Sequence, residues 1–188
     1  MKLSVEEYLK LDRAAEVKSE YHDGEMFPIE AVSLVHGYIS LNLGGWLKQS
    51  LKPGACRGIG VSIRVRVSPS KYVVPDFVVF CGEPELTDEQ QDTLTNPKTI
   101  LEILSPSTAN YDFGEKFKLY RRLPTFDEYV LISKDSARVE TYFKTPENQW
   151  ILSTYAGLDA IVPLRSLDTS IPMAEIYDDI ELPAQVED

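Results

Sequence analysis

Residues 72–80, YVVPDFVVF, and residues 99–104, TILEIL, are the stretches that decide the fold of this chain. Both are rich in the β-branched and aromatic residues that favour strands, and each carries one acid among them. Because side chains alternate between the two faces of a strand, Asp76 and Glu102 each share a face with two aliphatic residues. A carboxylate in such surroundings is costly unless water or a cation compensates its charge.

Asp76 and Glu102 on neighbouring strands would form a pair of hard oxygen ligands, which suits Mg²⁺ or Mn²⁺. A structural alternative stays open for each acid. Asp76 follows Pro75 and could simply mark the start of a strand, whereas Glu102 could form an ion pair with Arg64 or Arg66. The metal site is favoured because it explains both acids together.

A cation is expected beside this pair. Lys116 lies on the helix predicted after strand 99–104, with Asp112 and Tyr120 one helical turn to either side. A loop that leads from a strand into a helix can bring the helix start back over the end of that strand, so Lys116 could face the acids. The alternative is a solvated helix face, which the other basic residues of this helix favour: Lys118, Arg121 and Arg122.

The remaining pattern predicts a mixed sheet with helices on its faces. Capping-box patterns at Ser4 and Asp112 announce two helices, and a third is expected over residues 29–50. The alternating residues 59–67 and the stretch 72–80 are typical of one β-hairpin. Further strands are predicted at 99–104, 128–134, 138–144 and 149–155, with a turn at 22–25, an irregular loop at 82–96 and a short helix after residue 172. We therefore predict an α/β (α+β) fold in a single domain, 1–188, whose tail frays from about residue 180.

The chain has 188 residues and a net charge of −11. This charge argues against a protein that coats nucleic acid through a broad positive surface, but it leaves room for a local basic patch. No apolar run reaches the roughly 20 residues of a membrane span, and the acidic N-terminus does not resemble a signal peptide. A cytoplasmic location without membrane contact is expected. Cys56 and Cys81 are expected to be buried packing residues rather than a disulfide framework or zinc ligands.

Other catalytic motifs are missing from the sequence. It contains no GxxxxGK[ST] phosphate loop, no GxGxxG after a strand and no serine nucleophile elbow. The two histidines, His22 and His36, do not have the spacing of a zinc-binding helix. No organic cofactor is therefore expected.

Taken together, these stretches resemble the Uma-type putative restriction endonucleases, small bacterial proteins of the PD-(D/E)xK nuclease fold. The resemblance runs from residues 20–24, EYHDG, to the strand at 129–131. Between them it includes Pro75-Asp76, residues 102–108 and the spacing of Asp112, Lys116 and Tyr120. A short acidic motif alone would be weak, but this ordered set is specific. It implies a restriction-endonuclease-like mixed central β-sheet flanked by helices.

The resemblance also implies roles for individual residues. Asp76 and Glu102 match the two acids of the motif and would ligate the metal, with the backbone carbonyl of Ile103 as a further ligand. The motif normally has its lysine two positions after the second acid, where this chain has Leu104. In the Uma-type pattern the cation comes from the following helix, and Lys116 occupies that place.

Two further residues match the family pattern. Glu20 matches an N-terminal acid that would support the site directly or through water. His36 matches a histidine on the long helix, and a plain hydrogen-bonded helix residue is an equally good interpretation of it.

These observations predict a Mg²⁺- or Mn²⁺-dependent endonuclease that hydrolyses DNA phosphodiester bonds. Arg64, Arg66 and the basic helix face would hold the DNA backbone. The alternative is a catalytically inactive nuclease-fold module that binds nucleic acid or protein, which the acidic charge and Leu104 favour. A homodimer is expected as well, because cutting both strands of a duplex calls for two sites.

Overall fold

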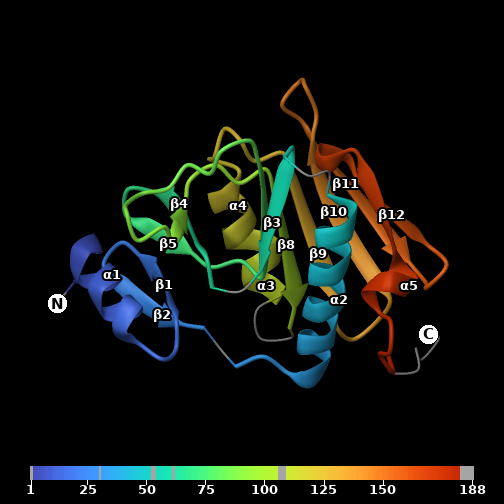
Figure 1. Ribbon diagram of the computed structural model, residues 1–188, viewed down its shortest axis with the longest axis horizontal. Helices are drawn as coiled ribbons and strands as arrows, with labels where there is room; N and C mark the ends of the chain where they lie inside the picture. Colours follow the sequence, from blue (N-terminus) through green and yellow to red (C-terminus); the bar gives the residue numbers. More distant parts are fainter. Residues whose placement is uncertain (1, 30, 52–53, 61, 106–108, 183–188) are drawn as a thin grey trace.

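Two β-sheets form the framework of the chain (Figure 1). The computed structural model describes residues 2–29, 31–51, 54–60, 62–105 and 109–182. The larger sheet has six strands in the order β11-β10-β9-β8-β6-β3, and only its central pair, β8 and β9, is parallel. We call it the large sheet; its strands are β3 Cys56–Gly60, β6 Phe77–Cys81, β8 Thr99–Leu104, β9 Glu128–Ser133, β10 Arg138–Lys144 and β11 Trp150–Ala156.

The second sheet lies beside the first, in the left half of Figure 1, together with helix α1 (Val5–Ala14). Its strand order is β2-β1-β5-β4-β7. We call it the small sheet; its strands are β1 Ser19–His22, β2 Glu25–Pro28, β4 Arg64–Ser68, β5 Lys71–Val73 and β7 Thr93–Leu94. A separate hairpin of β12 (Ile161–Leu164) and β13 (Thr169–Pro172) precedes the short helix α5 (Met173–Ile176).

Helices cover both faces of the large sheet. Helix α2 (Leu34–Ser50) packs on the face that carries Leu101 and Ile103. The opposite face carries Ile100 and packs against the helical segment 109–120. That segment consists of α3 Ala109–Tyr111, a π-helical turn at Asp112–Lys116 and α4 Phe117–Tyr120. Because neighbouring strand residues alternate between faces, the side chain of Glu102 points toward segment 109–120.

The expected antiparallel pairing of residues 59–67 with residues 72–80 is confirmed, but it is divided between the two sheets, because the chain changes sheets twice within it. β3 ends at Gly60 and pairs with β6 in the large sheet, whereas β4 begins at Arg64 and pairs with β5 in the small sheet. Ser62 has a left-handed φ of 65°, which interrupts the first strand. Pro75 interrupts the second, since it has no N–H to donate to a ladder. The break leaves Asp76 beside β8.

The alternating pattern predicts a polar outer face that includes Arg64, and this prediction is wrong. The Arg64 side chain is 3% exposed and forms ion pairs with Asp12 and Asp92, while Arg66 is exposed. The alternation holds, but helix α1 covers this side of the small sheet and supplies Asp12. Arg64 is therefore unable to hold a DNA backbone.

The helix boundaries differ from the sequence prediction at two N-termini. α1 begins at Val5 with the predicted capping box between Ser4 and Glu7. The helix predicted for residues 29–50 begins only at Leu34, where Ser33 caps it by accepting from the His36 N–H. The helix predicted to open at Asp112 begins at Ala109 instead. A carboxylate expected at a cap thus lies inside a helix, beside Lys116.

Cys56 and Cys81 form a disulfide, so the expectation that they are free packing residues is wrong. They are register partners on β3 and β6, and directly opposed residues of adjacent strands bring their Cβ atoms close together. Both residues are only partly buried.

The C-terminal part of the described chain packs on the large sheet. The short helix predicted after residue 172 is α5, and Ile180 and Leu182 contact the core beyond it. The rest of the tail that was predicted to fray, 183–188, lies outside the described residues. Among the helices of the described chain, none is long and apolar enough to cross a membrane.

Candidate active site

Asp76 and Glu102 meet at the point where β6 stops pairing with β8. The backbone N–H of Asp76 donates to Glu102 Oε2 at 3.2 Å, and the N–H of Ile103 donates to Asp76 Oδ2 at 2.7 Å. Glu102 is 2% exposed, whereas the Asp76 side chain is 25% exposed. One acid is thus fixed inside the fold, and the other faces the opening.

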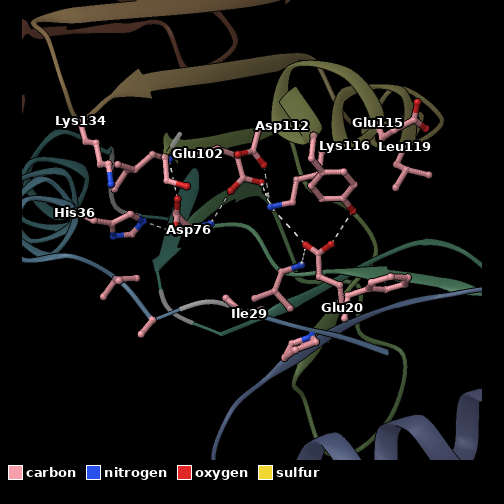
Figure 2. Close-up of a pocket in the computed structure, with 18 of the residues that line it drawn as sticks. Glu20, Ile29, His36, Asp76, Glu102, Asp112, Glu115, Lys116, Leu119 and Lys134 are labelled. Atoms are coloured by element: carbon pink, nitrogen blue, oxygen red, sulfur yellow. Dashed lines mark hydrogen bonds and ion pairs between the residues drawn. The ribbon is translucent and has the colours of Figure 1, made fainter. Parts of the chain in front are cut away.

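Lys116 lies within the π-helical turn and reaches the same place (Figure 2). Its Nζ donates to Glu102 Oε1 at 3.0 Å and lies 3.4 Å from both Glu20 Oε1 and Asp112 Oδ1. Its side chain is 9% exposed. Tyr120 donates to the same Glu102 oxygen at 3.0 Å from one turn further along. The solvated helix face that was the alternative for Lys116 is therefore wrong.

Glu20 reaches the site from the small sheet. Its Oε1 accepts from the Val74 N–H at 3.1 Å, and its Oε2 accepts from the Tyr111 hydroxyl at 2.7 Å. His22 contacts both groups, with its Nε2 3.3 Å from Glu20 Oε2 and 3.0 Å from the Tyr111 hydroxyl. The Glu20 carboxylate, which β1 carries, is thus held in place by the backbone at Val74 and by Tyr111 of helix α3.

His36 contacts Asp76 from the first turn of α2. Its Nε2 lies 3.1 Å from Asp76 Oδ1, and its Nδ1 lies 3.3 Å from the Ser40 hydroxyl. This histidine lies at the end of the site away from Lys116 (Figure 2).

Burial and opposite charge work against each other in this cluster. Burial raises the pKa of Glu102 to about 8, although the Lys116 ammonium opposes the change. Burial would also raise the pKa of Glu20, but Lys116 and the hydrogen bonds from His22, Tyr111 and Val74 outweigh it and lower this pKa to about 2. Burial would lower the pKa of Lys116, yet the carboxylates around it hold the pKa well above its ordinary value. Lys116 is therefore a charged ammonium.

The site opens into a cavity of about 600 Å³. The acid cluster, which we define as Glu20, Asp76, Glu102 and Asp112, lines one part of it. Three lysines also line the cavity: Lys71, Lys116 and Lys134. None of the basic residues that the sequence analysis assigned to DNA binding (Arg64, Arg66, Lys118, Arg121 and Arg122) lies at this cavity.

The acid cluster suits a divalent cation of the magnesium type by its chemistry. Its members carry more negative charge than the single ammonium of Lys116 balances. Within the described residues no group of three or more His, Cys, Asp and Glu side chains is arranged to hold a metal ion. Asp76 and Glu102 would thus need backbone oxygen and water to complete a ligand set, and Mg²⁺ is commonly held by one or two carboxylates and several waters.

Sequence reasoning brought together Asp76, Glu102, Lys116 and Glu20, and the structure places these side chains in one cluster (Figure 2). Ile103 lies there too, with its N–H on Asp76. Tyr111 and Lys134 were missed. Tyr111 precedes the predicted helix start, and Lys134 stands at the end of the predicted strand 128–134, where a lysine carries no signal of its own.

Comparison with solved structures identifies the class of fold. A crystal structure from Anabaena variabilis, described as a putative nuclease belonging to DUF820, matches with a TM-score of 0.74 and 21% sequence identity. The match covers 93% of this chain and 97% of that one. The chain therefore has the mixed α+β, restriction-endonuclease-like fold of that protein.

Sequence comparison gives the family. The family model Uma2, described as "Putative restriction endonuclease", matches residues 5–174, and the chain belongs to this family. Two relatives from Synechocystis sp. bear the names uncharacterized protein sll1609 and uncharacterized protein slr1290. The first is 36% identical over 159 residues, which cover 84% of this chain and 90% of the relative. The second is 32% identical over 177 residues, which cover 94% and 92%.

Proposed function

We propose that this chain is a Mg²⁺- or Mn²⁺-dependent endonuclease that hydrolyses DNA phosphodiester bonds. The observation that carries the proposal is the placement of Lys116 Nζ 3.0 Å from Glu102, whose other carboxylate oxygen accepts from the Asp76 backbone. Two acids and a charged amine beside a cavity are the groups that phosphodiester hydrolysis needs. Membership of a family described as "Putative restriction endonuclease" supports the same conclusion.

The roles of the residues follow from their exposure and contacts. Asp76, Glu102 and the Ile103 carbonyl would hold the metal, which when bound would acidify water and neutralise charge on the scissile phosphate. Lys116 would orient the attacking water or stabilise the negative charge that grows on the phosphate. Glu20 and Tyr120 position Lys116 and Glu102. His36 would keep the exposed carboxylate of Asp76 oriented.

A catalytically inactive binding module is the second candidate. The observation that favours it is that three carboxylates already surround Lys116, since an amine held by Glu102, Glu20 and Asp112 is less available to a phosphate. Leu104 at the usual lysine position of the motif favours it too. A titration separates the two candidates, because an inactive site would bind neither Mg²⁺ nor Mn²⁺ at millimolar concentration.

The test is incubation of the purified chain with plasmid, linear duplex and single-stranded DNA in Mg²⁺ or Mn²⁺. The Glu102→Gln variant, which keeps the shape of the side chain, is expected to lose cleavage while it retains the melting temperature of the parent. Glu140→Gln is the matched control, since Glu140 lies on strand β10 and does not line the cavity. Cleavage by Glu102→Gln at the parent's rate would overturn the assignment.

A homodimer is part of the proposal only where both strands of a duplex are cut, because each cut needs its own site. Sedimentation equilibrium with and without DNA measures the assembly state. A monomer that cuts one strand at a time would remove the dimer from the proposal and leave the chemistry in place.

A further inference from the structure

The cavity of the acid cluster has a second side that the proposed chemistry does not use. It consists of the end of β2 and the segment that leads to α2, which also contributes Ser33 to the lining. Five of the cavity-lining residues here are apolar: Phe27, Pro28, Ile29, Ala31 and Val32. We call these residues the apolar wall. Figure 2 shows Ile29 below the acids, across the cavity from Glu102. A carboxylate site that serves only a phosphate has no need of such a surface.

Parts of the apolar wall are exposed in a way that packing does not explain. Phe27 is 47% exposed and Val32 is 63% exposed, although both line the cavity. The Phe27 and His22 rings lie edge to face, with ring centroids 5.5 Å apart. One face of the wall is therefore available to a flat apolar group. Exposed apolar residues gathered at one cavity mark a binding surface more often than they mark a packing defect.

Lys134 adds a cation at the other end of the cavity. It follows Ser133, the last residue of β9, which pairs with the last residue of β8, Leu104. Figure 2 shows Lys134 and Lys116 on opposite sides of the acids. Unlike Lys116, Lys134 forms no ion pair with any residue that the structure describes. Its ammonium is thus available to a phosphate beside the scissile one.

The geometry points to an unpaired nucleotide as the occupant: we propose that the site acts on single-stranded segments of nucleic acid, with one base against the apolar wall and a neighbouring phosphate on Lys134. This inference rests on the proposed nuclease function and names its substrate class. Aromatic side chains bind unpaired bases by stacking, and this needs no particular sequence. A paired base cannot expose its face in this way, because its neighbours in the duplex cover it.

The size and charge of the site favour an unpaired strand over an intact duplex. A cavity of about 600 Å³ encloses a molecule the size of a small ligand and not a double helix. A duplex also draws its affinity from cations that face both backbones. The chain has a net charge of −11, and Arg64 is buried in ion pairs.

The first test compares three labelled substrates in Mn²⁺: a single-stranded oligonucleotide, its blunt duplex, and the same duplex with a gap of unpaired nucleotides. We expect the single strand and the gapped duplex to be cut at least about tenfold faster than the blunt duplex. The Phe27→Ala variant should raise KM for the single strand about tenfold, since one base–aromatic contact is worth about that factor. Phe27→Tyr should restore the parental KM.

Leu158→Ala is the matched control, because Leu158 is 51% exposed and lies outside the cavity. It should leave KM and kcat unchanged. Equal cleavage of blunt duplex and single strand, or an unchanged KM in Phe27→Ala, would overturn the inference while the nuclease function stands.

A binding measurement decides the inference even if the parent cuts nothing. Fluorescence anisotropy of a labelled single strand, with Ca²⁺ in place of Mn²⁺, should give a Kd at least about tenfold below that of the duplex, and Phe27→Ala and Lys134→Ala should each weaken it. Binding of this kind without cleavage would refute the nuclease and keep the single-strand site. Duplex bound as tightly as single strand would refute the site.

Discussion

Two of the places where the described chain buries charge differ in how many positive and negative groups they bring together. On the small sheet, Arg64 pairs with Asp12 and Asp92, and Arg13 pairs with Asp92 and Asp88 at 2.8 and 2.6 Å. We call this the arginine network. It sets two arginines against three aspartates, and none of its members lines the cavity.

The acid cluster places four carboxylates beside one ammonium, that of Lys116, and all five residues line the cavity. Lys116 pairs with Glu20, Glu102 and Asp112, whereas Asp76 contacts His36. Burying more negative than positive charge costs free energy unless another positive group, a bound cation or a proton compensates it. The arginine network supports the fold, whereas the surplus of acids beside the cavity is the feature on which the proposed metal site rests. Substitutions in the arginine network should therefore lower mainly the free energy of unfolding, whereas substitutions in the acid cluster should lower mainly cleavage or metal binding.

Lys116→Met should give the largest effect, because it removes the one ammonium of the acid cluster. Cleavage should fall by about 10²- to 10³-fold, the usual loss when one stabilising group is removed from a reaction site. Stability should fall as well, and more at pH 8 than at pH 6, because carboxylates left without Lys116 take up protons more easily at lower pH. Lys118→Met, two residues further along on the exposed face, is the control and should change neither quantity. Parental activity in Lys116→Met would show that the cluster needs no ammonium.

Arg64→Met tests the arginine network. It leaves the fully buried Asp12 without a guanidinium, and breaking such a pair from one side costs about 3–5 kcal/mol of the free energy of unfolding. Urea denaturation measures this loss, and kcat of the remaining folded protein should be unchanged. Arg66→Met, an exposed arginine on the same strand, should leave stability near the parental value. A loss of kcat in folded Arg64→Met would contradict the division between the two clusters.

Glu20→Gln tests whether the charge of one member of the acid cluster stabilises the fold, through the pH dependence of the free energy of unfolding. The folded-state pKa of Glu20 is lowered from 4.5 to about 2, so its charge stabilises the fold above pH 4.5, and this contribution is lost as the pH falls toward 2. The parent should exceed Glu20→Gln by about 3 kcal/mol at pH 6, and the difference should shrink steadily below pH 4.5. Denaturation curves at several pH values measure it, with the exposed Glu16→Gln as control. A difference independent of pH would mean that the charge of Glu20 does not contribute.

His36→Ala should give the smallest effect of the series. Loss of the contact with Asp76 Oδ1 should weaken Mn²⁺ binding about tenfold, as removal of a group that orients a metal ligand commonly does. Calorimetric titration measures the affinity, and Tyr38→Ala, an exposed residue on the same helix, is the control. Unchanged affinity would leave His36 as an ordinary hydrogen-bonded helix residue.

The sequence predicted the parts of the fold that depend on local pattern. The strands at residues 99–104, 128–134 and 138–144 and the capping box at Ser4 lie where alternation and capping chemistry place them. The two pairs β1–β2 and β12–β13 were missed, because each strand has four residues and too little alternation to stand out. The change of sheets at Ser62 and Pro75 depends on partners far along the chain, which a local pattern cannot contain.

The site residues that could be predicted are those whose residue type or spacing is unusual for the element that carries them. Asp76 and Glu102 stand out because an acid on an apolar strand face is costly, and Lys116 stands out by its spacing from Asp112 and Tyr120. Lys134 and the apolar wall break no rule in the sequence, since a lysine after a strand and a few apolar residues before a helix are ordinary. Only the folded chain brings them to one cavity.

Residues 74–76, where the chain crosses from the small sheet to the large sheet, link the two sheets by hydrogen bonds. The Val74 N–H donates to Glu20 of the small sheet, and the Asp76 N–H donates to Glu102 of the large sheet, so these neighbouring amides bridge the two halves. Glu20 and Glu102 also share Lys116, so a rotation of one sheet against the other would lengthen the contacts of both carboxylates. The two amide hydrogen bonds therefore depend on how the two sheets are packed against each other. Faster hydrogen exchange at the Val74 and Asp76 amides would report a loosening of this packing that a melting curve does not detect.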